Sequence, residues 1–250
     1  IRDFCLSRGL GDVYKRQILN ILIILGVTAL ITNVAIQKTT FKYEIPYMLL
    51  ITAVLLVMGM TGNEITFIEG VILWILFIAY LLYLYFLAKK GNDSGDEQSV
   101  KLYPVWKCLL FIVLGGVCVV IGSQLVVNGA TTIARACGMS ERFIGLTIVA
   151  FGTSLPELVT SVSAARKGNA GIAIGNIVGS NIFNILFVIG TVALICPVPF
   201  ESRFVIDTVV AILCGVLLWG GTIRHKELRK PCGVVMLLCY AAYFVYLAAM

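Results

Sequence analysis

Long apolar stretches run through almost the whole of this chain and restrict what it can fold into. A helix needs about 20 apolar residues to cross the hydrocarbon core of a bilayer. Eight stretches poor in Asp, Glu, Lys and Arg approach or exceed that length: 18–36, 45–62, 65–88, 108–134, 142–165, 170–196, 204–220 and 231–249. Only 13% of the 250 residues are charged, about half the share of a soluble domain. The sequence therefore predicts an all-α integral membrane protein with eight helices, and it excludes a soluble enzyme.

The basic residues between these stretches are distributed unevenly, which predicts the orientation of the chain. If the loops alternate across the membrane, 12 of the 19 Lys and Arg residues fall on one side and three on the other, while four lie in the first 16 residues. The side with 12 should be cytoplasmic, because translocating Lys and Arg is disfavoured. The polar linker 89–103 then lies in the cytoplasm, and the C-terminus is extracellular or periplasmic. We attribute the net charge of +6 to topology in the cell (inner) membrane and expect no nucleic-acid partner.

Two parts of the chain resemble one another, which predicts an internal repeat. Residues 18–31 and 182–195 share eight of 14 positions, including Asn20 with Asn184. Further matches at a nearly unchanged offset extend the similarity through three consecutive spans. Five spans separate the copies, and an odd number of crossings inverts one copy relative to the other, as in many secondary transporters. Chance similarity of apolar segments is the alternative, but it predicts no common offset.

The similarity stops abruptly upstream of residue 18, in the middle of a predicted helix. Residues 1–17 are charged, unpatterned and without the features of a signal peptide. We therefore expect them to be a non-native leader on an N-terminally truncated protein. The predicted organisation is a leader (1–17), the last three spans of the first repeat (18–88), the linker (89–103) and the five spans of the second repeat (104–250).

Glu157 is the only acidic residue in the middle of an apolar stretch, and intramembrane carboxylates usually mark an ion or proton path. Helical spacing places Thr153 and Ser154 on the same face as Glu157. Pro156 lacks an N–H group and opposes the carbonyl of Gly152, so nearby carbonyls lose their helical donors. Carboxylate, hydroxyl and carbonyl oxygens are the ligands that Ca²⁺ and Na⁺ require. The alternative is a carboxylate paired with a basic residue for packing, but no span interior contains one.

The next stretch carries two rows of residues at four-residue spacing. One row is Gly171, Gly175 and Gly179, which predicts close approach to a neighbouring helix. The other is the polar row Asn176, Ser180 and Asn184, which supplies side-chain oxygens toward that interface. The alternative is that these Asn and Ser side chains serve only as hydrogen bonds between helices.

At these residues the sequence resembles the bacterial sodium/calcium exchangers of the cation/calcium antiporter superfamily. Their signatures are a GTSLPE-type motif in one helix and a GSNIFN-type motif in the next, present here at 152–157 and 179–184. The resemblance runs from about residue 18 to the end. It implies the inverted-repeat exchanger fold, with ten spans when complete and about eight present here. The expected partners are therefore Ca²⁺, Na⁺, the lipid bilayer and the missing N-terminal spans of the same protein.

The family's roles can be carried over residue by residue. The resemblance implies that Glu157 binds Ca²⁺ through its carboxylate and Thr153 through its carbonyl. It implies that the carbonyl of Ala150 and the hydroxyls of Ser154 and Ser180 bind Na⁺.

Asn184, and Asn20 from the other half, correspond to central positions that help to bind water or cation. Some members have an acidic residue where this chain has Asn184, so a further bound cation and potassium dependence are not implied. The first GTSLPE-type helix is absent, and with it half of the Ca²⁺ cage.

The function indicated is export of Ca²⁺ coupled to Na⁺ entry, by alternating access and without covalent chemistry or a cofactor. One alternative is a Ca²⁺/H⁺ or other cation/H⁺ exchanger in which Glu157 titrates on each cycle. A rival from another class is a non-transporting membrane scaffold, because we expect the 250-residue chain by itself not to transport.

Overall fold

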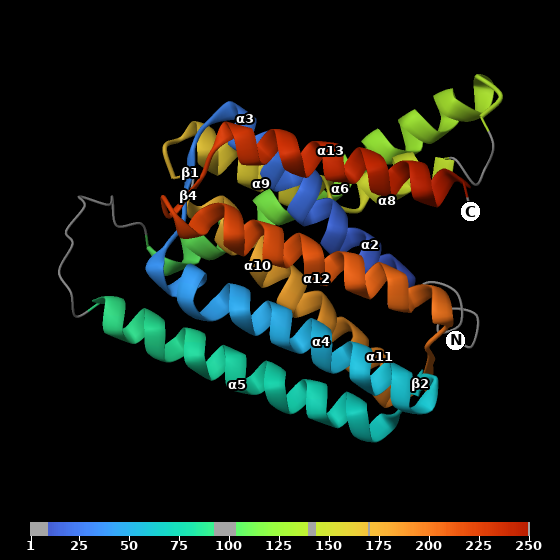
Figure 1. Cartoon of the computed structure of the whole chain (residues 1–250). Helices are drawn as coiled ribbons and strands as arrows, with labels where there is room; N and C mark the ends of the chain where they lie inside the picture. The colour runs from blue at the N-terminus through green and yellow to red at the C-terminus, as the bar shows by residue number, and fades with distance from the viewer. Residues whose placement is uncertain (1–9, 93–103, 140–143, 170, 250) are drawn as a thin grey trace.

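The computed structural model describes residues 10–92, 104–139, 144–169 and 171–249, which fold almost entirely into helices (Figure 1). Seven helices within these ranges are long and apolar enough to cross a membrane. This confirms the predicted all-α integral membrane fold. The predicted leader 1–17 and linker 89–103 lie partly outside the described residues.

The two halves have similar orders of elements, in which η marks a π-helical segment. The first half contains α2 (Leu10–Leu19), η1 (Asn20–Ile24), α3 (Leu25–Ile31), β1 (Val34–Ala35), η2 (Thr40–Glu44), α4 (Ile45–Gly62), β2 (Glu64–Ile65) and α5 (Phe67–Asn92). The second half contains α6 (Val105–Ala136), η3 (Gly145–Val149), α8 (Ala150–Gly152), α9 (Leu155–Arg166), α10 (Gly171–Phe183), η4 (Asn184–Ile189), α11 (Gly190–Ile195), β3 (Val198–Pro199), α12 (Ser202–Ile223), β4 (Glu227–Leu228) and α13 (Lys230–Ala249).

The predicted span 142–165 is not one continuous helix. Of its described part, η3 and α8 form the first piece and α9 the second, with a turn at Thr153 and Ser154 between them. Pro156 at the start of α9 explains the break, because its ring nitrogen cannot donate to the carbonyl of Gly152. The stretch expected as one of eight helices is therefore two helices, and the break falls in the motif expected to bind ions.

The inverted repeat is visible in how the short strands pair. Strand β1 of the first half pairs antiparallel with β4 of the second, and β2 of the first half pairs with β3 of the second. The two pairs lie at opposite ends of the bundle (Figure 1). Helix α4 runs from the β1–β4 end to the β2–β3 end, whereas α12, its equivalent in the second half, runs the other way. Equivalent helices therefore point in opposite directions.

Glycines let helices from the two halves cross closely at two symmetric places. Helix α3 packs on α13, and α11 packs on α5. A Cβ atom added at Gly233 would lie 2.8 Å from the carbonyl oxygen of Gly26. At the other crossing, a Cβ at Gly70 would lie 3.1 Å from the carbonyl oxygen of Gly190. Such close backbone contact between membrane helices is typical of small residues.

Helix α2 begins at Leu10, upstream of the expected start of native sequence at residue 18. It continues through η1 into α3 as one helical span. The side chains of Tyr14 and Gln17 are buried in it. The origin of residues 1–17 is not tested by this packing, and the non-native leader stays a prediction.

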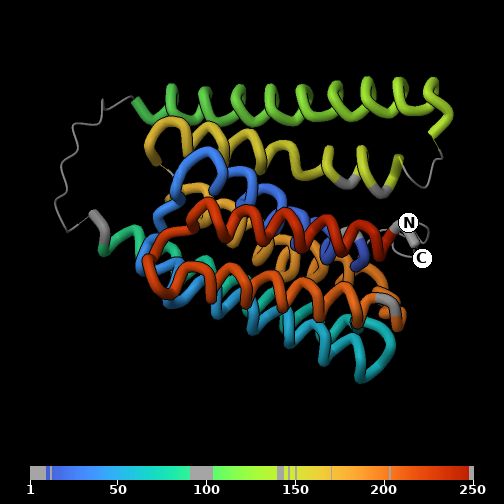
Figure 2. The backbone as a smooth tube through the Cα atoms, turned by 45° about the horizontal axis from the view of Figure 1, so that its top comes forward, coloured from blue at the N-terminus to red at the C-terminus, as the bar shows by residue number. Residues whose placement is uncertain are grey.

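Helix α6 lies along the edge of the molecule, next to the broken helix of α8 and α9 (Figure 2). None of the residues in the most apolar 18-residue segment of α6 is buried, whereas 67% of those in the corresponding segment of the span Val13–Ile31 are buried. The buried core is formed mainly by α2, η1, α3, α4, α10 and η4, with side chains from α5 and α12. Of these elements, α3, η1 and α10 contact α9, and α2 contacts α8.

Candidate cation-binding site

The turn between α8 and α9 changes the backbone hydrogen bonds of the motif. The amide of Ser154 donates to the carbonyl of Phe151 at 3.0 Å, rather than to that of Ala150, where an uninterrupted α-helix would direct it. Pro156 has no amide to offer Gly152. The carbonyls of Ala150 and Gly152 therefore lack their usual α-helical donors, as the sequence predicts. That they bind a cation stays a prediction.

Glu157 lies in the first turn of α9 and is half-buried. The hydroxyl of Ser180 on α10 donates to its Oε1 atom at 3.0 Å. This bond joins the two motifs across the contact between α9 and α10. The structure thus brings together two of the predicted ligands from helices 23 residues apart in sequence.

Thr153 and Ser154 do not lie on one continuous helical face with Glu157, which corrects the sequence interpretation. The helix is broken between them, so Thr153 is exposed while Ser154 is only 1% exposed. The Oγ atom of Ser154 is buried without a hydrogen-bond partner among the described residues. An unsatisfied buried hydroxyl costs free energy, so this oxygen is a good candidate for an ion or water ligand.

Asn184 begins the π-helical segment η4, and Asn20 begins its equivalent η1 in the other half. Single π-helical turns are frequent at functional sites because they redirect side chains from the regular helical positions. Both asparagines are buried. Asn184 Nδ2 and Asn20 Oδ1 have no hydrogen-bond partner within the described ranges. The predicted central positions therefore retain unused polar atoms.

Asn181 is a buried polar residue beside the candidate site that the sequence analysis did not single out. It is fully buried and accepts a hydrogen bond from Asn20 Nδ2 at 3.2 Å, so it links the two halves next to Ser180. Gln17, which stands opposite it in the repeat, is also buried and donates to Thr52 Oγ1 at 3.1 Å. Gln17 and Asn181 stand at the same offset as the matched residues 18–31 and 182–195, so extending the repeat upstream by one residue identifies both.

A cavity of about 260 Å³ lies against the broken helix. Gly152, Thr153 and Pro156 of the motif border it, facing the polar side chains of Gln124 and Asn128 on α6. Arg16 of α2 also lines the cavity, at the position that the repeat pairs with Ser180. A guanidinium here opposes cations in the cavity by Coulomb repulsion.

The glycine row of α10 does not behave as expected. A Cβ at Gly171 would meet the carbonyl of Ala35 at 3.3 Å, but one at Gly175 or Gly179 would meet nothing within 4 Å. The described residues therefore leave the face at Gly175 and Gly179 open, and close packing there was a wrong prediction. In the polar row, Asn176 donates to Thr160 Oγ1 on α9 at 2.9 Å, which is the structural role we had kept as the alternative.

Two buried carboxylates outside the motif were also missed. Asp207 lies fourth in the stretch 204–220, and its Oδ1 accepts a hydrogen bond from Tyr243 at 2.7 Å. Glu44 lies just before the stretch 45–62, in η2. Both are at least nine-tenths buried. An acidic residue near the end of an apolar stretch is typical of the membrane–water interface, so the sequence predicts that Glu44 and Asp207 are exposed. In the structure, neighbouring helices bury both side chains.

Among the described side chains, no three His, Cys, Asp or Glu residues converge to hold a metal ion. The candidate site instead combines one carboxylate with hydroxyl, amide and backbone carbonyl oxygens. This chemistry suits hard cations such as Ca²⁺ and Na⁺ and is unlike the Cys and His ligands of zinc sites.

Comparison with known proteins gives consistent matches. The family model described as "Sodium/calcium exchanger protein" matches residues 8–86 and 107–249. Inner membrane protein YrbG of Escherichia coli (strain K12) is 31% identical over 253 residues, a match that covers 94% of this chain and 74% of YrbG. Sodium/calcium exchanger MaX1 of Methanosarcina acetivorans is 38% identical over 142 residues, which cover 56% of this chain and 41% of MaX1. The structure of the sodium-calcium exchanger NCX_Mj soaked with zero Na⁺ and Ca²⁺ has a TM-score of 0.78 at 30% identity, covering 96% of this chain and 76% of that one.

Proposed function

Because this chain belongs to the sodium/calcium exchanger protein family, we propose that it exchanges Ca²⁺ for Na⁺ across the cell membrane by alternating access. The family and the structural neighbours are those of cation/calcium exchangers, which are membrane transporters. The observation that carries the proposal is the Ser180–Glu157 hydrogen bond. It joins the two motifs beside a broken helix, among buried oxygens without partners.

The proposed ligands divide by ion. Ca²⁺ binds the carboxylate of Glu157 and the carbonyl of Thr153, because a divalent cation gains most from the charged oxygen. Na⁺ binds the carbonyl of Ala150 and the hydroxyls of Ser154 and Ser180. Since Ser180 donates to Glu157 in the described geometry, occupation of the Na⁺ site changes a contact of the Ca²⁺ ligand.

The two asparagines at the starts of η1 and η4 complete the proposed site. Asn20 and Asn184 hold water or a cation at the contact between the two halves, where their unused polar atoms lie. Coupling between the ions arises at the Ser180–Glu157 contact, because a Na⁺ ion bound by the Ser180 hydroxyl lies beside the carboxylate that binds Ca²⁺. Each ion shifts the equilibrium between conformations only by its differential affinity for them.

The distribution of basic residues predicts which end of the bundle faces the cytoplasm. The β1–β4 end of the bundle bears most of the basic residues, and we propose that it faces the cytoplasm. The N-terminal spans expected from the family resemblance stay a prediction.

The open face of α10 at Gly175 and Gly179 is where such a helix would fit.

Flux in proteoliposomes tests the proposed exchange. Vesicles containing the full-length protein are loaded with Na⁺ and diluted into Na⁺-free buffer with radioactive Ca²⁺. We expect Ca²⁺ uptake driven by the outward Na⁺ gradient and none driven by an outward proton gradient alone. Uptake driven by protons without Na⁺ would instead identify a Ca²⁺/H⁺ exchanger. Residues 1–250 reconstituted by themselves are expected not to transport.

The Na⁺ ligands can be tested separately from the Ca²⁺ ligand. Ser154→Ala removes a buried hydroxyl that has no protein partner to lose, so we expect the fold to persist. Removing one neutral ligand should weaken Na⁺ binding by about tenfold, corresponding to roughly 1.4 kcal/mol. The measurement is the Na⁺ concentration that half-displaces bound radioactive Ca²⁺.

Ser163→Ala on the exposed side of α9 is the matched control. It makes the same chemical change on α9, which directly follows Ser154, and should leave the half-displacing Na⁺ concentration unchanged. Equal behaviour of the two variants would remove Ser154 from the Na⁺ site.

A further inference from the structure

The inverted repeat places a buried carboxylate at equivalent positions in its two halves. Glu44 precedes α4, and Asp207 lies in the early turns of α12, 163 residues later. They are 8% and 6% exposed. The following helix of each half carries a tyrosine at the same offset, Tyr80 on α5 and Tyr243 on α13. The two pairs lie toward opposite ends of the bundle, since equivalent helices run in opposite directions.

The second half satisfies its carboxylate internally. The hydroxyl of Tyr243 donates to Asp207 Oδ1 at 2.7 Å, and both side chains are buried. This hydrogen bond ties α12 to α13. A buried carboxylate that accepts such a hydrogen bond is satisfied by the protein itself.

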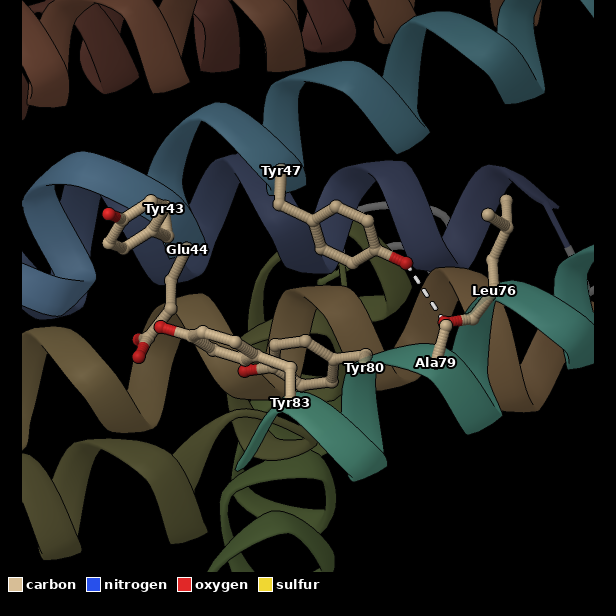
Figure 3. A pocket seen from close by; sticks show the side chains of 7 residues that line it. All are labelled: Tyr43, Glu44, Tyr47, Leu76, Ala79, Tyr80 and Tyr83. Carbon is tan, nitrogen blue, oxygen red and sulfur yellow. Dashed lines mark hydrogen bonds between the residues drawn. The ribbon is translucent and has the colours of Figure 1, made fainter. Parts of the chain in front are cut away.

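The first half has an open pocket at the same place (Figure 3). Its volume is about 280 Å³, which is several times that of a water molecule. Glu44 lines it together with four tyrosines and two aliphatic side chains: Tyr43, Tyr47, Tyr80, Tyr83, Leu76 and Ala79. We call this the tyrosine pocket. In contrast to Asp207, Glu44 receives no hydrogen bond from its equivalent tyrosine among the described contacts.

The rings of the tyrosine pocket form a continuous aromatic wall. Tyr47 and Tyr80 are stacked with centroids 5.5 Å apart, and Tyr80 and Tyr83 are stacked at 6.2 Å. The Tyr47 hydroxyl is used, because it donates to the carbonyl of Leu76 at 2.9 Å. The Tyr83 hydroxyl is buried and has no partner among the described residues.

The charge of Glu44 is not neutralised by the protein. No ion pair between Glu44 and a basic side chain is found in the described part of the chain. A buried carboxylate requires a compensating partner. Aromatic faces beside a carboxylate favour an organic ammonium group through cation–π attraction. A bare Ca²⁺ or Na⁺ ion would need more oxygen ligands than this mostly apolar wall offers.

The location of the tyrosine pocket near the membrane surface favours a lipid headgroup as the source of the ammonium group. It lies where the span beginning at Thr40 and the span ending at Lys90 meet the basic end of the bundle. Tyrosines concentrate at this depth of a membrane. Lys42 and Lys89 are exposed at the same end, and Lys42 Nζ lies 5.3 Å from the centroid of the Tyr43 ring. Lysines at this position can bind a phosphate.

We propose that the tyrosine pocket is a binding site for the headgroup of phosphatidylethanolamine. The primary ammonium lies against Glu44 and the aromatic wall and donates to Glu44 and the free Tyr83 hydroxyl, while the lipid phosphate lies toward Lys42. Phosphatidylcholine carries the same charge but has no N–H donor for these oxygens, so it binds more weakly. Phosphatidylglycerol has no ammonium group and does not bind in the pocket.

Native mass spectrometry of the purified chain with each lipid tests this assignment. We expect one phosphatidylethanolamine to bind at least about tenfold more tightly than phosphatidylcholine or phosphatidylglycerol, since hydrogen bonds to charged groups are among the stronger ones. Glu44→Gln should abolish this preference. Glu64→Gln, an exposed carboxylate at the β2–β3 end, is the matched control and should keep it.

Tyr83→Phe provides a second test that retains the carboxylate and the aromatic wall. It removes only the free hydroxyl, and we expect it to bring phosphatidylethanolamine and phosphatidylcholine affinities several-fold closer. Preference for phosphatidylethanolamine that survives both Glu44→Gln and Tyr83→Phe would overturn the proposal. Tighter binding of phosphatidylcholine would do so as well, by showing a site for quaternary ammonium.

Discussion

Glu157→Gln is expected to abolish Na⁺-driven Ca²⁺ uptake by the full-length protein. Glutamine has nearly the same shape and can still accept the hydrogen bond from Ser180, but it carries no charge. Losing one partner of a desolvated charge pair costs about 2–5 kcal/mol, which corresponds to a Ca²⁺ affinity weaker by a factor of about 30 or more. Uptake of radioactive Ca²⁺ and equilibrium Ca²⁺ binding measure the two effects.

Two controls separate loss of the ligand from loss of the fold. Glu64→Gln removes an exposed carboxylate in β2, outside both motifs, and should leave both measurements unchanged. Thermal unfolding of Glu157→Gln without Ca²⁺ should match that of the unsubstituted protein. Ca²⁺ raises the Tm only when it binds to the folded protein. The Ca²⁺-dependent rise in Tm should therefore disappear in Glu157→Gln. Retained flux in a normally folded variant would overturn the assignment of Glu157.

The second large effect concerns the helix crossings. Gly233→Val should lower the Tm by about 5 °C or more, because overpacking costs roughly 1–3 kcal/mol and sometimes more. The new Cβ would lie 2.8 Å from the carbonyl oxygen of Gly26 and 3.0 Å from Ala29 Cβ. Backbone atoms cannot move aside as a flexible side chain can, so α13 must separate from α3. Thermal unfolding in detergent measures the change.

The same prediction can be tested at the symmetric crossing of the inverted repeat, with a glycine of α6 as the control. Gly70→Val should have a similar effect, since its Cβ would lie 3.0 Å from Ala193 Cβ at the symmetric crossing. Gly116→Val on α6 would meet nothing within 4 Å and should be neutral. If both crossing variants unfold at the same temperature as Gly116→Val, close backbone contact does not hold the halves together.

The spans were predictable because the bilayer requires long apolar helices whatever their partners. The same rule failed for the stretch 142–165, where Pro156 divides one apolar segment into two helices. Hydropathy records only composition, so it cannot register a break. The proline itself did predict the freed carbonyls beside Ala150 and Gly152, because that effect is local.

The site was predictable where it depended on motifs and not where it depended on contacts between halves. Glu157 and Ser180 carry recognisable patterns, and the structure joins them. Asn181 lies inside the second motif and matches Gln17 in the repeat, but their burial and their hydrogen bonds to Asn20 and Thr52 depend on which helices cross at the centre. The open face at Gly175 and Gly179 shows the reverse case, in which a packing pattern had no neighbour among the described residues.

The sequence by itself determined the membrane environment, the repeat and the candidate ligands. The length of an apolar stretch, the spacing between matching residues and the chemistry of a side chain can all be read from the linear order of residues. Tertiary structure alone decided which equivalent residues became different. Asp207 meets Tyr243, whereas Glu44 faces an open pocket, although both stand at the same place in the repeat. The physical reason is that a buried charge is governed by the atoms packed around it, and those atoms come from distant parts of the chain.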